Sequence, residues 1–158
     1  METSPSHKLS PFGEKLEKAI SHIARSDRPE FVATSLTGSA RALFIALLAE
    51  RLERPLVVTA ASYETADSFR QDLELFVDED KLQFFPHWDT IPYDNQSPDK
   101  DVIAVRFQAL KQILDQQANV TITTVHALMR QIMPPQIFAA HCYGLKESDS
   151  YNREDLLN

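Results

Sequence analysis

The stretch Thr34-Ser35-Leu36-Thr37-Gly38-Ser39-Ala40-Arg41-Ala42 gives the strongest indication of the fold. It follows an apolar run at residues 31–33 and precedes a helical pattern over residues 39–54, so it indicates a loop between a strand and a helix. That is the position of a phosphate-binding P-loop, written G-x-x-x-x-G-K-[ST]. The stretch therefore predicts an α/β fold of the P-loop NTPase kind.

The loop departs from the P-loop pattern at all four defining positions. Ser35 and Ala40 stand where the pattern has glycine, and Arg41 stands where it has lysine. Ala42 replaces the residue whose hydroxyl binds Mg²⁺. We therefore expect a vestigial P-loop with no cofactor, no metal and no catalysis, made of Ser35, Thr37, Gly38, Ser39, Ala40, Arg41 and Ala42. The alternative is weak phosphate binding by loop 35–42 at the N-terminus of the following helix.

Strands and helices alternate along the rest of the chain. Apolar runs predict strands at residues 31–35, 56–60, 82–85 and 120–123. Helical spacing predicts helices at residues 11–25, 40–54, 63–77 and 98–117, and a short one that is capped by Thr124, runs to Met133 and is ended by Pro134-Pro135. This alternation predicts an open, mostly parallel sheet flanked by helices. On the helix at 98–117, the spacing assigns the core face to Ile103, Phe107, Leu110 and Leu114.

Composition and charge narrow the possible functions. The chain has 158 residues, 43% of them hydrophobic and 25% charged, as in an ordinary folded domain. The single cysteine, Cys142, excludes a disulfide framework, and the polar N-terminus leads us to expect a cytoplasmic protein with no membrane contact. Residues 55–158 hold eight basic and sixteen acidic groups, which argues against a stand-alone DNA-binding module. A local basic patch remains as an alternative, at Arg25, Arg28, Arg41, Arg51 and Arg54.

A second informative segment runs from Phe84 to Asp94 and continues to Ser97-Pro98. The carboxylates of Asp89 and Asp94, beside Trp88, allow an acid/base pair in an aromatic cleft. The simpler interpretation is a loop stiffened by prolines, in which Trp88 is a packed anchor and the aspartates cap turns. We favour the second interpretation. The histidines lack the spacing of metal ligands.

Together the two segments resemble the N-terminal region of bacterial transcription-repair coupling factors, the Mfd family. The resemblance covers residues 12–158 and rests on the degraded loop, on Pro55-Leu56-Val57-Val58, on Pro134-Pro135, and on a signature loop. That signature loop comprises Trp88, Asp89, Pro92, Tyr93, Asp94, Ser97, Pro98 and Arg106.

The resemblance implies a module similar to the nucleotide-binding domain of the repair protein UvrB, without its ATPase loop. Residues 1–10 would be a flexible tail, residues 11–141 the UvrB-like domain, and residues 142–158 the start of an inserted second domain. In such factors this module recruits UvrA, and the domains that contact RNA polymerase and DNA lie elsewhere in the polypeptide. We therefore expect a truncated, non-catalytic scaffold that self-associates or frays where its neighbouring domains are missing.

Overall fold

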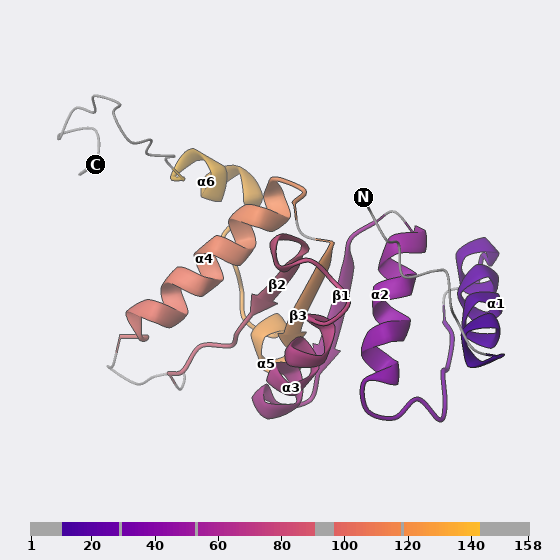
Figure 1. The fold of residues 1–158 in the computed structure, drawn as a ribbon. Helices are drawn as coiled ribbons and strands as arrows, with labels where there is room; N and C mark the ends of the chain where they lie inside the picture. Colours follow the sequence, from indigo (N-terminus) through magenta and orange to yellow (C-terminus); the bar gives the residue numbers. More distant parts are fainter. Residues whose placement is uncertain (1–10, 29, 53, 91–96, 118, 143–158) are drawn as a thin grey trace.

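A computed structural model describes residues 11–28, 30–52, 54–90, 97–117 and 119–142 (Figure 1). The helices are α1 (Pro11–Arg25), α2 (Ala40–Leu52), α3 (Tyr63–Leu73), α4 (Lys100–Leu114), α5 (Val125–Leu128) and α6 (Pro135–Ala140), with a 3-10 turn η2 (Glu79–Lys81). The strands are β1 (Leu56–Ala60), β2 (Leu82–Phe85) and β3 (Val120–Thr124). The tail at 1–10, the segment with Pro92, Tyr93 and Asp94, and residues 143–158 lie outside the described residues.

The three strands form an open parallel sheet in the order β1-β3-β2. Leu56 lies opposite Val120 in the first pair, and Leu82 lies opposite Val120 in the second. Because β3 is the central strand, every one of its residues is buried, whereas alternate residues of β1 are exposed. The α/β class with a mostly parallel sheet, predicted from the alternation of elements, is confirmed.

Helices cover the sheet on both faces. Ala42 and Ala49 of α2, with Ala66 and Leu73 of α3, pack with Ile122 in one core. On the opposite face, a smaller core is formed by Phe85 of β2, Ala109 of α4 and Ala127 of α5.

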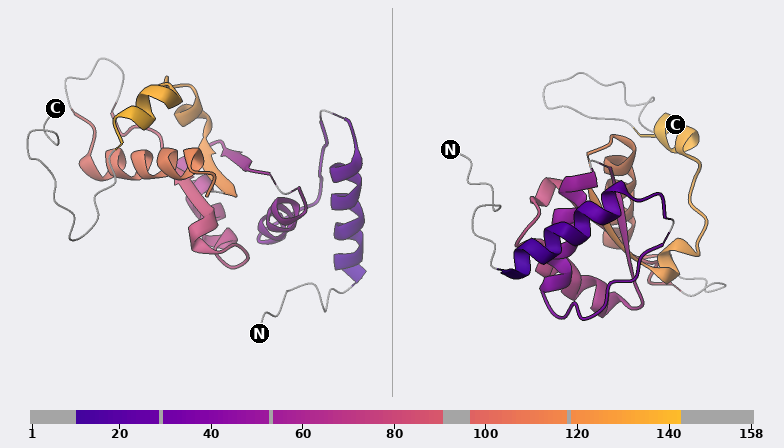
Figure 2. Two further views of the ribbon diagram at one scale, coloured as in Figure 1. Left: turned by 90° about the horizontal axis from the view of Figure 1, so that it is seen from above. Right: turned by 90° about the vertical axis from the view of Figure 1, so that its right-hand side faces the viewer.

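Helix α2 separates α1 from the sheet, as the views in Figures 1 and 2 show. Helix α1 buries Leu16 and Ile20 and lies against α2. A helix that contacts neighbours on two sides needs apolar residues around most of its circumference, which explains the nearly continuous apolar sequence of α2.

Two predicted caps are confirmed. The Ser62 side chain accepts a hydrogen bond from the Thr65 backbone N–H at the start of α3. The Thr124 side chain does the same for the Ala127 N–H at the start of α5. Both caps are local interactions, because the donor lies three residues after the acceptor.

Three predictions about the elements are wrong. Residues 31–35 form no strand: Val32 is 82% exposed, and the Phe31 ring meets the His22 ring of α1 edge-on, with centroids 5.9 Å apart. On α4, Leu110 of the predicted core face does pack against the core, but Phe107 and Leu114 are 47% and 38% exposed, and the helix instead buries Arg106 and Ala109. The helix predicted to run from Thr124 to Met133 ends at Leu128, and Pro134-Pro135, predicted to end a helix, instead leads into α6, in which Pro135 is the first residue and proline is well tolerated.

Candidate functional site

The 35–42 loop enters α2 without a preceding strand, so the strand-loop-helix setting of a P-loop is not present. Ser35 and Gly38 both have positive φ angles, 64° and 54°, and the chain turns sharply there. The backbone N–H groups of Ala40 and Arg41 donate to the carbonyls of Thr37 and Gly38, at 3.3 and 3.2 Å. These two amides therefore close the turn and do not point at a ligand.

Residues of α3 contact the Ser39 and Arg41 side chains, which are the side chains that would have to bind a phosphate at this loop. The Ser39 hydroxyl donates to Asp72 Oδ1 at 3.1 Å, which places a carboxylate at the N-terminus of α2. The Arg41 guanidinium carbon lies 5.9 Å from the centre of the Phe69 ring. Ala42 is fully buried in the core. The Asp72 carboxylate lies at the N-terminus of α2, where the helix dipole would attract an anion. The loop therefore connects α2 to α3 through the Ser39–Asp72 hydrogen bond, and this carboxylate opposes the binding of a phosphate.

The signature loop is organised by a buried arginine from α4. Arg106 is 2% exposed, and its guanidinium carbon lies 4.1 Å from the centre of the Phe85 ring and 4.2 Å from that of Trp88. Its Nη1 group donates to the carbonyl oxygen of Pro86. We call Phe85, Trp88 and Arg106 the arginine clasp. Burial, with a smaller contribution from the charge of Arg130, lowers the pKa of Arg106.

Asp89 ties the two ends of the signature loop together. Its two carboxylate oxygens accept the Asp99 backbone N–H at 3.1 and 3.3 Å. Asp99 in turn caps α4 by accepting the Asp101 N–H at 2.8 Å. Asp89 therefore connects to the start of α4, ten residues further along the chain, and the half-buried Trp88 ring lies against the Arg106 guanidinium. The turn-capping role of the aspartates and the anchor role of Trp88 stay predictions. Ser97 is exposed and Pro98 is half-buried beside this junction.

Three aromatic side chains gather where the parallel strands end, a grouping that the sequence analysis missed. Tyr63 follows β1, His87 follows β2 and His126 follows β3. The His87 ring centroid is 6.0 Å from that of Tyr63 and 6.3 Å from that of His126. Within the described residues, the buried Nδ1 atom of His87 has no hydrogen-bond partner. This grouping could have been predicted from the sequence, because each of the three residues comes two or three positions after a predicted strand. The carboxyl ends of parallel strands lie at the same edge of a sheet, so residues that follow them are brought together.

Other candidate sites are not supported by the described geometry. Arg41 and Arg51 of the basic patch are ten residues apart on α2, which corresponds to about 15 Å along the helix axis, so the five arginines do not form one compact patch. No cluster of three or more His, Cys, Asp or Glu residues suited to a metal occurs among the described residues. In the same part of the chain, no helix combines the length and apolar character that a membrane span requires.

Comparison with known proteins decides the family. The chain is 31% identical over 121 residues, 77% of its length, to the transcription-repair-coupling factor of Escherichia coli. It is also 31% identical over 117 residues to that of Mycobacterium tuberculosis, and 27% identical over 110 residues to that of Haemophilus influenzae. The chain belongs to the transcription-repair-coupling factor family. No protein-family model matches it.

The match to this family covers a small part of each relative. The chain spans about a tenth of the length of the three coupling factors named above: 10% of the E. coli protein, 9% of the M. tuberculosis protein and 10% of the H. influenzae protein. The relatives are named for coupling transcription to repair, and that name describes proteins roughly ten times as long as the matched segment.

Proposed function

We propose that this chain is a non-catalytic scaffold module of a transcription-repair-coupling factor and serves in transcription-coupled nucleotide excision repair in the cytoplasm. Residues 11–141 form its UvrB-like domain, and residues 142–158 begin the inserted second domain. The module recruits UvrA, chiefly through that second domain. RNA polymerase, DNA and the ATP-driven translocase are engaged by other domains of the complete polypeptide.

The contact between Ser39 and Asp72 carries the non-catalytic part of the proposal. In a working P-loop, backbone amides and a lysine surround the phosphates and a hydroxyl holds Mg²⁺. Here a carboxylate accepts the Ser39 hydroxyl at the start of α2, and the side chain at position 42 is a buried methyl group. Both features disfavour a bound nucleotide, and together they support a loop that joins two helices.

Weak phosphate binding at residues 35–42 is the second candidate function. It rests on the general affinity of helix N-termini for anions. The Asp72 carboxylate opposes it, because a phosphate at this terminus would meet a like charge next to Ser39.

A chimera tests the scaffold function. The matching segment of the E. coli coupling factor is replaced by this chain, and strand-specific repair and ATP hydrolysis are measured in the same preparation. We expect repair of the transcribed strand to be retained, and ATP hydrolysis to be unchanged when Arg41→Ala is added within the chain. A chimera that hydrolyses ATP normally but repairs both strands equally would contradict the scaffold role. A fall in hydrolysis caused by Arg41→Ala would instead favour a catalytic loop.

A further inference from the structure

Three hollows adjoin one another along β2, an outer strand of the described sheet. The first has a volume of about 570 Å³ and lies next to η2, and the second, of about 180 Å³, lies beside the middle of the strand. The third, of about 540 Å³, lies where β2 ends at Pro86. Leu82 and Gln83 line the first two hollows, and Phe84 lines the last two. The hollows are therefore parts of one depression, which we call the β2 groove.

Helices α3 and α4 form the two walls of the β2 groove. Tyr63 and Arg70 come from α3, and Val105 and Gln108 come from α4. The strand between them pairs with β3 along one edge, and its other edge has no strand partner among the described residues. Every second residue on such an edge directs its backbone N–H and C=O outward, so the groove contains hydrogen-bonding groups that an extended chain can use.

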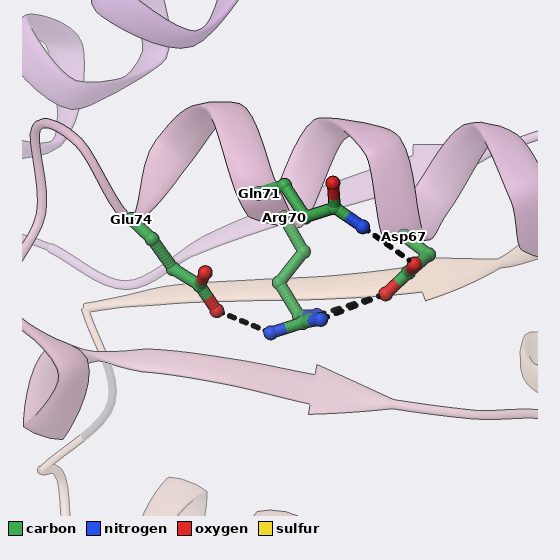
Figure 3. Close-up of polar contacts among 4 residues, drawn as sticks. All are labelled: Asp67, Arg70, Gln71 and Glu74. Carbon is green, nitrogen blue, oxygen red and sulfur yellow. Dashed lines mark hydrogen bonds and ion pairs between the residues drawn. The ribbon is translucent and has the colours of Figure 1, made fainter.

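The lining of the β2 groove is strongly acidic. Its carboxylates are those of Glu64, Glu74, Glu79, Asp80, Asp89 and Asp101. Among the described residues that line the groove, Arg70 is the only lysine or arginine, and a carboxylate lies on each side of its guanidinium. Figure 3 shows its guanidinium between Glu74 and Asp67, and the Asp67 contact measures 2.9 Å. The groove thus presents a net negative field to whatever enters it.

We propose that the β2 groove binds an extended, lysine- or arginine-rich segment of a partner protein, which joins the sheet as an added strand. Backbone hydrogen bonds to β2 supply the pairing, and the carboxylates select a basic segment. At the hollow beside Pro86, the apolar wall of Tyr63, Phe84 and Val102 suits the stem of a basic side chain, with Asp101 at the rim for its charged head. A second copy of this chain would bring the same carboxylates to the groove, so its own β2 edge is a poor partner.

This interaction goes beyond the proposed scaffold function and does not depend on it. The simplest competing explanation is that the carboxylates only protect an open edge from aggregation, as charged side chains do on many edge strands. The two explanations predict different hydrogen exchange at the backbone amides of β2 when a basic peptide is added. Exchange slows if the peptide pairs with the strand, and it is unchanged if the carboxylates only prevent aggregation.

The test uses short fluorescent peptides and the full chain at low ionic strength. One peptide alternates lysine with valine and threonine, a second carries glutamate in place of lysine, and a third is the lysine peptide with alternate backbone nitrogens methylated. We expect only the first to bind well and to slow hydrogen exchange at residues 82–85. Methylation should weaken binding about tenfold, because it removes main-chain donors while it keeps the charge.

A pair of charge variants locates the site on the protein. Glu79→Lys with Asp80→Lys should weaken binding of the lysine peptide about tenfold, because both carboxylates line the groove. Glu17→Lys with Glu50→Lys makes the same change of charge on α1 and α2, and should leave the affinity within about twofold. The proposal is overturned if the lysine peptide does not bind, if the methylated peptide binds equally well, if amides 82–85 stay unprotected, or if both variant pairs weaken binding alike.

Discussion

Replacing Arg106 by methionine should loosen the signature loop without emptying the space that the side chain fills. Methionine is long and flexible enough to occupy most of that volume, but it carries no charge and no hydrogen-bond donor. The variant therefore removes the contacts of the guanidinium with Phe85 and Trp88, and leaves the Pro86 carbonyl without its donor.

The expected loss follows from the contacts of the arginine clasp. Two cation–π contacts at 4.1 and 4.2 Å between desolvated groups stabilise the fold by about 1–2 kcal/mol each. A buried carbonyl that loses its partner costs about 1–3 kcal/mol. Burying the charge acts in the opposite direction, as the lowered pKa of Arg106 indicates, and methionine relieves that cost. We expect a net destabilisation of about 2 kcal/mol.

Urea unfolding followed by tryptophan emission is the appropriate assay, because Trp88 is the only tryptophan in the chain. A loss of about 2 kcal/mol should lower the urea midpoint by about 1 M, and the folded-state emission should change as the guanidinium leaves the ring. Lys111→Met on the same helix is the control: among the described residues its ammonium pairs with Asp115 at the exposed surface, so the urea midpoint should stay close to that of the wild type. If Arg106→Met unfolds at the wild-type midpoint with unchanged Trp88 emission, the arginine clasp does not stabilise the loop.

Three further results are expected. Because Asp72 opposes an anion at the start of α2, calorimetry with ATP and Mg²⁺ should give no affinity tighter than about 1 mM, and micromolar binding lost in Arg41→Ala would disprove this. The pKa of Glu64 lies below its ordinary value of 4.5, because the carboxylate accepts hydrogen bonds from the Glu64 backbone N–H and from Ser62. The ionised Glu64 therefore stabilises the folded state above pH 4.5, and this contribution is lost as the pH falls through the lowered pKa. The difference in Tm between wild type and Glu64→Gln should accordingly shrink from pH 6 to pH 3, and a constant difference would exclude this role. Val57 on β1 is 62% exposed, so we expect the chain to self-associate at high concentration and Val57→Lys to lower the mass measured by light scattering, whereas an equal mass for the two proteins would refute this prediction.

Features set by neighbouring residues were predictable from the sequence. The helix caps at Ser62 and Thr124 and the bounds of β1 and β2 agree with the prediction, because each depends on side chains within a few positions of one another. The order of strands and helices was sufficient for the α/β class, since a parallel strand needs a long connection before the next one.

Features that join distant segments were decided only by the folded chain. Residues 31–35 have a strand-like pattern, but a strand needs a neighbour to pair with, and Phe31 instead meets His22 of α1. Spacing on α4 favoured Phe107 for the core, whereas the side chain buried there is Arg106. The rings at positions 85 and 88 shield its charge, and the carbonyl oxygen of residue 86 accepts its hydrogen bond. The degenerate loop was visible at residues 35–42, but the carboxylate that occupies its anion position comes from Asp72 on the next helix, beyond the reach of any local pattern.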